Sequence, residues 1–445
     1  MSLLQTVKTV YRGLPPWTTA WLRLVPDEIL FGNGYRTTDP STDFNLVRHN
    51  LKKALDYSRA HTVWGRENVP EKIDADEVES LILTLPTVTS DELASEPGRF
   101  TSDTASASNS YWTTTGGTGR KPTGIRLCNE SYGIEWKHIH AIWGADYSRL
   151  NDMKLTFRGY RLKEGELFRF DPIYNELSVD SFQVNDCNFK LFLKKLRGYR
   201  VSCLHGYPSL ITLFMERLRS VGEAFDVRFV FLGSEGASSD LKRQIGEFFH
   251  ARVFSWYGLS EKVVLAFNMN MSDKFVIFSS YGYPWIRHPD ENGIGEIVGT
   301  TFVNKAMPLV NYRTGDYGRN RRQLQNDGRE VLVLDCLHGR WGKDFVYRTS
   351  QEKIPTSAIN LHSEIQKKIV FYQIVQNEVG RLLVKVLPKE GVSASVVCAE
   401  LERELSVKLK GFAISCRSVK CDSELQKSAR GKLMMLVQSV KEADK

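Results

Sequence analysis

Two consecutive stretches, YPSLITLFMERLRS (207–220) and VRFVFLGSEG (227–236), decide the fold that this sequence predicts. In the first stretch, Leu210, Phe214 and Leu218 recur at helical spacing and would form one apolar face. The second stretch is a short apolar run that stops at glycine, which is typical of a buried strand. Together they predict a helix that leads into a strand.

The same alternation continues on the C-terminal side. SDLKRQIGEFF (239–249) predicts another amphipathic helix, and ARVFSWYGLSE (251–261) predicts a strand that enters a loop. Strands that alternate with helices of about 10–15 residues indicate a largely parallel sheet. From about residue 275 strands and hairpins dominate, as in GEIVGTTF (295–302) and VLVLDCL (331–337). We expect an α/β fold whose large N-terminal domain combines mixed, largely parallel sheets with helices.

The character of the sequence changes after HGRWGKD (338–344). The residues that follow predict a hairpin at 369–388, a helix at 393–409 and then a strand, which is a compact α+β unit. We therefore expect an N-terminal domain, 1–339, and a small α+β C-terminal domain, 340–445.

The composition is that of a globular chain. Its 445 residues are 42% hydrophobic and 11% aromatic, which is enough for a large buried core, and the length allows two or three domains. The net charge of +8 permits anionic partners such as nucleotides and does not by itself argue for nucleic acid. We interpret the densest basic run, RNRRQ (319–323), as a solvated loop.

The cysteines and the N-terminus favour a cytoplasmic protein. No apolar signal-peptide region and no apolar run of about 18 residues is present, so we expect no membrane-spanning segment. For YRGLPPWTTAWLRLVP (11–26) we favour a packed helix pair over contact with a membrane surface. Seven scattered cysteines without CxxC or zinc spacing indicate free thiols in a reducing compartment. They are Cys128, Cys187, Cys203, Cys336, Cys398, Cys416 and Cys421.

One segment, TTTGGTGRKPTG (113–124), is too rich in glycine and hydroxyl side chains to pack a core. Glycines let backbone N–H groups approach an anion closely, and threonine hydroxyls add donors. The spacing fits neither a GxxxxGK[ST] phosphate loop nor a GxGxxG dinucleotide fingerprint. Taken alone, the segment is equally compatible with a phosphate-binding loop and with a flexible surface loop.

Four further segments stand in a fixed order behind it: WYGLSE (256–261), YRTGD (312–316), GRWGKDF (339–345) and SARGKL (428–433). With the Thr/Gly-rich segment, this series resembles the motifs of the adenylate-forming enzymes, the acyl-CoA synthetases and their relatives. The resemblance covers nearly the whole chain and is loose between the motifs. It implies that the segment at 113–124 binds the phosphates of ATP.

Within that superfamily the sequence is most similar to the phenylacetate–CoA ligase branch and its CapK-like members of capsular polysaccharide biosynthesis. The features that carry this resemblance are YRGLPP (11–16), HGYPSL (205–210) before a helix, and KIPTSAIN (353–360) after the hinge motif. The sequence KVVLAF, which follows WYGLSE, lacks the glycines of phenylacetate ligases and leaves the acid-binding pocket undefined.

The resemblance implies a two-step reaction that needs ATP and Mg²⁺. A small-molecule carboxylic acid would become an acyl-adenylate with release of pyrophosphate, and the acyl group would then pass to coenzyme A. The alternative acceptor is an amine, an amino acid or a sugar hydroxyl, as in amide- or ester-forming relatives. A third hypothesis is a catalytically silent carrier or scaffold, against which the retained motif residues count. The family also leads us to expect a homodimer.

The same resemblance assigns the phosphates of ATP to eight residues. They are Thr113, Thr114, Thr115, Gly116, Gly117, Thr118, Gly119 and Lys121. Because GRKP places an extra base between glycine and proline, Arg120 is the alternative to Lys121 as the cation that faces the phosphates.

Glu261 would hold Mg²⁺ beside the triphosphate, since magnesium prefers oxygen ligands shared with phosphates. The hydroxyl of Ser260 would lie near the phosphate or the substrate carboxylate. The adenine side of the nucleotide is assigned to Tyr257, Gly258, Glu235 and Gly236.

Asp316 would accept hydrogen bonds from both ribose hydroxyls, and Arg340 would face the ribose or a phosphate. Lys432 would place its ammonium at the α-phosphate, where negative charge builds during adenylation. In this family the C-terminal domain rotates between the two half-reactions, and Gly342 would absorb the change at the hinge.

The aromatic stretch SYGIEWKHIHAIWG (131–144) has two interpretations. It could line the pocket for the acid, or it could be part of the core. Because Trp136, His140 and Trp143 recur at helical spacing, we favour the core.

Overall fold

The computed structural model describes residues 20–114, 123–268, 272–338, 345–348, 352–355, 365, 368–428, 431 and 433–440. Contacts within the chain divide it into two compact units. Unit 1 comprises Met1–Asp152, Asp171–Asn175 and Phe254–Gly339, and unit 2 comprises Met153–Phe170, Glu176–Val253 and Arg340–Lys445.

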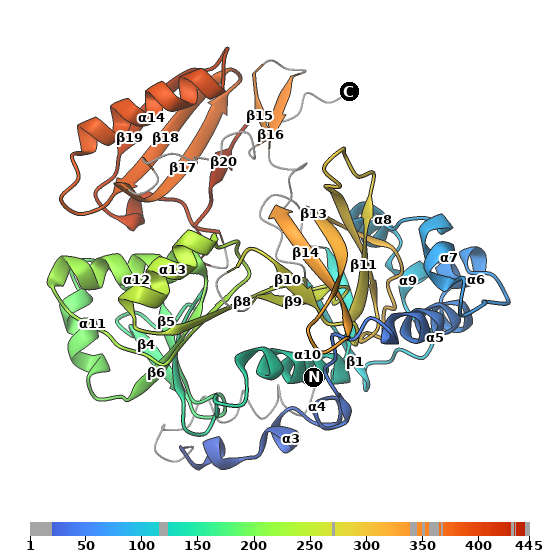
Figure 1. Ribbon diagram of the computed structural model, residues 1–445. Helices are drawn as coiled ribbons and strands as arrows, with labels where there is room; N and C mark the ends of the chain where they lie inside the picture. Colours follow the sequence, from blue (N-terminus) through green and yellow to red (C-terminus); the bar gives the residue numbers. More distant parts are fainter. Residues whose placement is uncertain are drawn as a thin grey trace. The chain divides into compact units, whose positions relative to one another are not determined.

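Unit 1 begins with short helices and a β-hairpin (Figure 1). The helical elements are η1 (Ala20–Leu24), α3 (Asp27–Leu30), α4 (Asn33–Thr37), α5 (Leu46–His61), α6 (Val63–Asn68), α7 (Val78–Thr84), α8 (Ser90–Ser95) and α9 (Pro97–Phe100). Strands β1 (Ser110–Thr114) and β2 (Gly124–Cys128) pair in antiparallel orientation and lead into α10 (Asn129–Trp143).

The rest of unit 1 is an antiparallel array with the order β11-β12-β13-β14-β10-β9-β8. Its strands are β8 (Arg252–Gly258), β9 (Leu265–Asn268), β10 (Phe275–Ile277), β11 (Gly282–Arg287), β12 (Gly295–Thr301), β13 (Tyr312–Leu324) and β14 (Glu330–His338). Apolar side chains of α5 and α7, such as Leu51 and Ile82, are fully buried in one core with those of the strands. This confirms the strands and hairpins predicted from about residue 275.

Unit 2 contains strands in the order β7-β6-β3-β5-β4, of which β7, β6, β3 and β5 run parallel. Their bounds are β3 (Met153–Arg158), β4 (Phe168–Asp171), β5 (Glu176–Asp180), β6 (Val201–Gly206) and β7 (Phe229–Gly233), with helices α11 (Phe189–Leu196), α12 (Pro208–Val221) and α13 (Ser239–Phe248). Helix α12 starts at a proline and ends at Gly222, whose φ of 66° closes the helix in the left-handed conformation. The predicted succession of helix and strand is confirmed, from α12 through β7 and α13 to β8.

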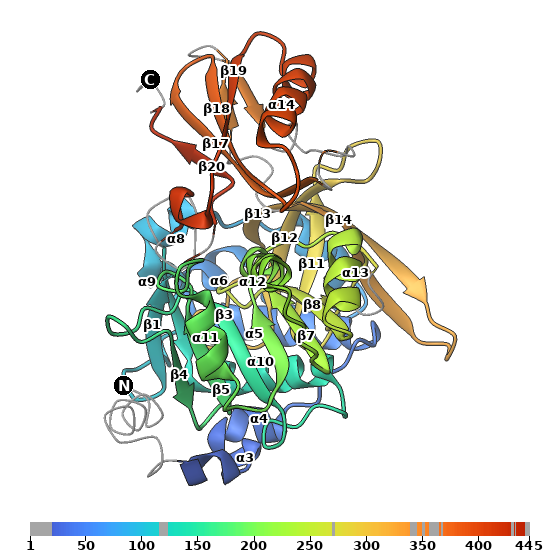
Figure 2. The ribbon, with the colours of Figure 1, turned by 90° about the vertical axis from the view of Figure 1, so that its left-hand side faces the viewer.

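The C-terminal part of unit 2 has its own core. Strands β15 (Phe345–Tyr347) and β16 (Lys353–Pro355) pair, and a second sheet has the order β19-β18-β17-β20. Its elements are β17 (Ile369–Glu378), β18 (Arg381–Pro388), α14 (Ala394–Lys408), β19 (Ala413–Ser418), η4 (Asp422–Glu424) and β20 (Leu436–Gln438). Helix α14 lies along one face of this sheet (Figures 1 and 2). The α/β class with a small α+β C-terminal part is confirmed, and the division into 1–339 and 340–445 stays a prediction.

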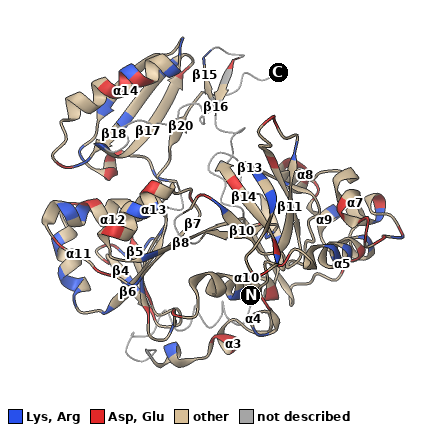
Figure 3. Ribbon diagram, viewed as in Figure 1, with Lys and Arg blue, Asp and Glu red and all other residues tan. Residues whose placement is uncertain are grey.

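The interpretation of residues 319–323 as a solvated loop is wrong, because they form part of β13. Arg319 and Arg321 both pair with Asp335 on the neighbouring strand β14, and Arg322 pairs with Glu79 of α7. Basic and acidic residues are likewise interspersed over most elements (Figure 3). The run is therefore a strand whose charges are compensated by partners far away in the sequence.

Two further findings concern the chain as a whole. All seven cysteines carry free thiols. Over the described ranges, no helix combines the length and the apolar character that crossing a membrane requires.

Helix α10 is anchored by aromatic packing and by a buried histidine. Trp136 stacks on Phe31 with ring centroids 5.4 Å apart, and Trp143 is fully buried, so these rings belong to the core as predicted. The ring of His138 contacts the carbonyl oxygen of Ile134 at 2.8 Å and the hydroxyl of Ser280 at 2.9 Å. Burial lowers the pKa of His138 to about 4, so the ring is neutral in the folded protein.

This histidine makes stability depend on pH. Between the ordinary pKa of 6.5 and the folded value of about 4, the unfolded chain binds a proton that the folded chain does not, so stability falls as pH decreases. We expect the wild type to lose about 2–3 kcal/mol more than His138→Gln between about pH 7 and about pH 4.5, measured by urea denaturation. His49→Gln, at an exposed position, is the control and should follow the wild type. Equal pH dependence of the wild type and His138→Gln would contradict this account.

Candidate functional site

The two motifs WYGLSE and YRTGD meet in unit 1 through a pair of reciprocal hydrogen bonds. Tyr257, at the end of β8, donates its hydroxyl proton to Oδ2 of Asp316 on β13, at 2.9 Å. Tyr312, at the start of β13, donates to Oε1 of Glu261, which follows β8, also at 2.9 Å. Each motif therefore supplies a tyrosine to the carboxylate of the other.

A bulge in β13 positions Asp316. Arg313 and Tyr317 are four positions apart on β13, whereas their partners on β12, Val298 and Glu296, are two positions apart, so β13 carries two extra residues here. The bulge includes Gly315 at a φ of 72°, a conformation in which glycine is strongly favoured. Bulges of this kind commonly aim a side chain at a functional site.

The hydroxyl of Thr314 fixes the backbone within this bulge. It accepts a hydrogen bond from the N–H of Asp316 at 3.0 Å and donates to the carbonyl oxygen of Ile297 at 2.8 Å. The bulge thus satisfies its own polar backbone groups while Asp316 stays buried, with a relative exposure of 9%.

The segment after β8 is held by a second charged contact. Lys262 adopts a φ of 60°, which is strained for a residue other than glycine, and its ammonium pairs with Glu135 of α10. The hydroxyl of Tyr281, which directly precedes β11, approaches the same carboxylate at 3.4 Å. Glu261 and Lys262 are adjacent in the sequence and oppositely charged, but each has its own partner. Lys262 pairs with Glu135, and Glu261 accepts the hydrogen bond from Tyr312.

The hydroxyls of Tyr257 and Tyr281 stay protonated, because each is buried beside a carboxylate. Burial and the nearby charge of Asp316 hold the pKa of Tyr257 well above its ordinary value. Burial and Glu135 do the same to the pKa of Tyr281. Both phenols therefore remain hydrogen-bond donors at any physiological pH.

Glu261 fits the requirements of a magnesium ligand. Its carboxylate is an oxygen donor at a relative exposure of 7%, and the hydrogen bond from Tyr312 fixes its orientation. Within the described parts of the chain no group of three or more His, Cys, Asp or Glu residues could hold a metal by itself. Magnesium is usually bound by one or two carboxylates together with substrate phosphates and water, and a single carboxylate such as Glu261 suits that arrangement.

The glycine-rich segment is described only at its edges. Thr113 and Thr114 end β1, and Thr114 pairs with Gly124 at the start of β2. The predicted phosphate ligands Thr115–Gly119 and Lys121, with the alternative Arg120, lie outside the described residues. So do Arg340, Gly342 and Lys432.

The other predicted residues are placed as follows. Gly258 is exposed at the end of β8, and the half-buried Ser260 makes no hydrogen bond within the described residues. Glu235 and Gly236 follow β7 in unit 2, where Oε2 of Glu235 accepts the N–H of Ser209 at 3.1 Å. Of the predicted residues, Tyr257, Glu261 and Asp316 are brought together in unit 1 by the two hydrogen bonds described above.

Sequence reasoning missed Tyr312, Glu135 and Lys262 as parts of the site. Tyr312 belongs to the quoted motif YRTGD, and its position in the motif was the available signal. Nothing in the local sequence pointed to the contact between Lys262 and Glu135, because these residues lie 127 positions apart.

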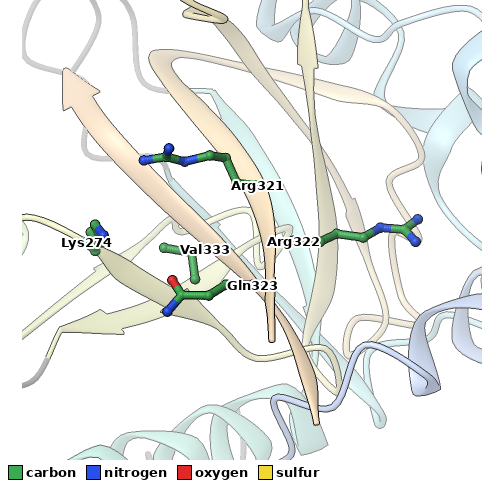
Figure 4. A pocket seen from close by; sticks show the side chains of 5 residues that line it. All are labelled: Lys274, Arg321, Arg322, Gln323 and Val333. Carbon is green, nitrogen blue, oxygen red and sulfur yellow. The ribbon is translucent and has the colours of Figure 1, made fainter. Parts of the chain in front are cut away.

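A separate depression on unit 1 lies over the strands β10, β13 and β14 and is lined by Lys274, Arg321, Arg322, Gln323 and Val333 (Figure 4). Arg321 is paired with Asp335 and Arg322 with Glu79, so two of its three cations are already compensated. None of the predicted site residues lines it, and we assign it no function.

Comparison of the sequence with known proteins identifies two curated relatives. The chain is 22% identical over 249 residues to Protein CapK of Staphylococcus aureus, covering 55% of this chain and 54% of that protein. It is 25% identical over 208 residues to the phenylacetate-coenzyme A ligase of Thermus thermophilus, covering 43% of this chain and 45% of the ligase. The matched region therefore spans about half the length of each relative. No family model matches the chain.

Solved structures show the same fold. A 2-hydroxyisobutyryl-CoA ligase in the postadenylation state, in complex with R3-HIB-AMP, has a TM-score of 0.63 at 15% identity and covers 88% of this chain and 89% of its own. The acyl acid amido synthetase GH3.15 has a TM-score of 0.54 at 14% identity, covering 85% and 86%. At these identities the likeness concerns the fold alone.

The hydrogen bond between Tyr312 and Glu261 leads to a prediction about stability. Tyr312→Phe keeps the buried ring and removes one donor from a buried carboxylate, so we expect the free energy of unfolding to fall by about 1–3 kcal/mol in urea denaturation. Tyr283→Phe is the matched control, because this ring lies in the same core and its hydroxyl makes no hydrogen bond within the described residues. Similar losses in the two variants would contradict a specific role of the Tyr312 hydroxyl.

The fold and the two sequence matches agree with the order of the motifs along the chain. The chain is thus similar in sequence to CapK and to phenylacetate-coenzyme A ligase over about half of its length, and it shares its fold with a solved acyl-CoA ligase and a solved acyl acid amido synthetase.

Proposed function

We propose that the protein activates a carboxylic acid with ATP as an acyl-adenylate and then transfers the acyl group to coenzyme A. The observation that carries this proposal is the pair of reciprocal hydrogen bonds that joins Glu261 and Asp316 through Tyr312 and Tyr257. It links the segment after β8, which carries the buried candidate for the magnesium ligand, to β13, which carries the buried candidate for the ribose acceptor.

In the first step a carboxylate oxygen attacks the α-phosphorus, the bond to the β-phosphate breaks, and pyrophosphate leaves. Asp316 would accept hydrogen bonds from the ribose hydroxyls, in an orientation fixed by Tyr257. Glu235 and Gly236, with Tyr257 and Gly258, would border the adenine. These contacts hold the nucleotide so that the entropy of alignment is lost on binding and not in the transition state.

The chemical difficulty of this step is charge repulsion, because a carboxylate must approach a phosphate. A magnesium ion held by Glu261 would neutralise charge on the phosphate oxygens when bound. In our proposal Lys121 or Arg120 and the hydroxyl and N–H groups of residues 113–119 contact the outer phosphates. Lys432 contacts the α-phosphate, where the negative charge increases.

In the second step the sulfur of coenzyme A attacks the acyl carbon, the thiol proton is released, and AMP leaves. Residues 340–445 would rotate about Gly342 between the two steps and withdraw Lys432. Coenzyme A is our choice of acceptor because one relative is a phenylacetate-coenzyme A ligase. A reaction that consumes ATP and coenzyme A fits the cytoplasm, where we place it, and a homodimer stays a prediction.

Exchange between ATP and labelled pyrophosphate tests the first step directly. We expect at least one acid of a broad panel to support exchange, and Lys432→Ala to lower the rate about 100-fold or more because charge at the α-phosphate is no longer compensated. Lys420→Ala, an exposed lysine of the same C-terminal part, is the control. If no acid supports exchange, or if Lys432→Ala exchanges like wild type, the proposed mechanism is wrong. Thioester formation against amide formation with the best acid then identifies the acceptor.

The role of Asp316 has its own test. Asp316→Asn keeps the shape of the side chain and its bond from Tyr257 but removes the charge, so we expect the KM for ATP to rise about 10-fold with little change in the KM for the acid. Asp335→Asn, a buried carboxylate on the adjacent strand β14, is the matched control and should leave both constants near wild type. An unchanged KM for ATP in Asp316→Asn would rule out the ribose contact.

A further inference from the structure

Helix α11 of unit 2 has one face that is packed into the core and another that is exposed. Four apolar side chains form the buried face: Phe189, Phe192, Leu193 and Leu196. The ring of Phe192 packs edge-on against Phe168 of β4, with centroids 5.8 Å apart, and against Phe214 of α12, at 6.3 Å. This packing fixes the rotation of the helix and thereby determines which of its residues face outward.

The exposed face of α11 and the turn that follows it are basic. Between Asp186 and Glu216 the sequence contains no acidic residue. All lysines and arginines of this interval lie within residues 190–200, and all are exposed: Lys190, Lys194, Lys195, Arg197 and Arg200. Figure 3 shows this concentration of Lys and Arg at α11. The region thus differs from most elements of the chain, in which the two signs of charge are mixed.

Most of these positive charges have no acidic partner. Arg197 pairs with Glu223 at 2.9 Å, and Asp186, the acidic residue that precedes the run, pairs with Arg217 at 2.9 Å. Within the part of the chain that the structure describes, no ion pair is formed by the other four bases, Lys190, Lys194, Lys195 and Arg200. The run at 319–323, in contrast, is compensated by acidic residues. The face of α11 therefore presents a net positive charge to a partner.

Two large hydrophobic side chains are exposed among these bases. Leu191 has a relative exposure of 49%, and Tyr199, whose ring packs edge-on against Phe168, has one of 39%. Because residues three and four apart are neighbours on the surface of a helix, Leu191 lies beside Lys194 and Lys195. A single exposed leucine is ordinary on a protein surface. A leucine bordered by uncompensated cations, however, suits a partner that is both anionic and apolar.

A membrane surface that contains anionic lipids combines these two properties. Its negatively charged headgroups attract lysine and arginine, and the layer beneath them accepts the side chains of leucine and tyrosine. The phosphates of a nucleic acid would match the same cations, but they offer no apolar surface to Leu191. The combination of charge and apolar exposure on α11 therefore favours the lipid surface.

We propose that residues 190–200, the exposed face of α11 with the turn behind it, dock the protein on an anionic membrane surface. The contact is peripheral, since the apolar face of the helix stays in the core of unit 2. Each base near such a surface strengthens binding roughly fivefold, so four uncompensated cations are sufficient for a measurable and salt-sensitive affinity. This inference goes beyond the proposed function and does not depend on it.

Sedimentation of the full chain with lipid vesicles tests the proposal. One set of vesicles consists of phosphatidylcholine alone, and the other contains about 30% phosphatidylserine. We expect the protein to sediment with the anionic vesicles and to stay in solution with the neutral ones. Raising the salt from about 0.1 M to about 0.5 M should release the bound protein, because it screens the attraction between the bases and the headgroups.

The charges of α11 are tested by the double variant Lys194→Gln, Lys195→Gln. We expect its affinity for the anionic vesicles to fall about 20-fold, because two of the attracted cations are lost. The control is Lys410→Gln, Lys420→Gln, which removes the same charge at two exposed positions of the C-terminal part and should bind like wild type. Thermal melting checks that each variant is folded.

The apolar part of the contact is tested by Leu191→Ala, which leaves every cation in place. We expect the affinity for the anionic vesicles to fall about fivefold, because less apolar surface is transferred from water to lipid. Leu324→Ala, at an exposed leucine of β13 in unit 1, is the control and should bind like wild type.

Three results would overturn the inference. The first is equal sedimentation with neutral and anionic vesicles, and the second is unchanged vesicle binding by the folded double variant at Lys194 and Lys195. The third is binding to a double-stranded oligonucleotide, unaffected by Leu191→Ala, without any sedimentation on vesicles, which would identify nucleic acid as the partner of this face. Loss of ATP–pyrophosphate exchange would affect the proposed function alone.

Discussion

The site of unit 1 depends on two tyrosine–carboxylate hydrogen bonds that run in opposite directions between β8 and β13. A single bond would let the two strand ends rotate about it, whereas two bonds at separate points fix their relative orientation. Both acceptors are buried carboxylates, which would be costly to enclose without a donor. The hydrogen bonds from the tyrosines therefore lower the free-energy cost of burying two negative charges. In our proposal these two charges serve the nucleotide and its metal.

Features that depend on residues close together in the sequence could be predicted from the sequence alone, and features that depend on distant residues could not. The helix α12 and the strand β7 were predictable because their apolar periodicity is local and is completed within a few residues. Glu261 and Asp316 were selected from the order of the motifs, and their roles stay predictions. The strand at 319–323 was not predictable, because its arginines are compensated by acidic residues on β14 and α7. The local density of positive charge suggested a solvent-exposed loop. The acidic partners from distant parts of the sequence instead allow the segment to form a strand.

The same limit applies to the candidate sites. The pairing of Lys262 with Glu135 joins residues that are far apart in the sequence and carry no shared pattern. The physical reason for this pairing is simple once the fold is known, since a buried cation needs an acceptor. Periodicity shows which side chains face inward, but it does not show which inward-facing charges will meet.

The bulge that carries Asp316 has a consequence for how this fold can change. Because the side chains of a strand alternate with a period of two, an insertion of one residue would exchange the inner and outer faces of everything that follows. The bulge adds two residues, so the remainder of β13 keeps the same parity as a strand without it. The residues of the bulge, including the proposed ribose ligand Asp316, can therefore be replaced, or the bulge can be lost, without inverting the faces of the rest of β13.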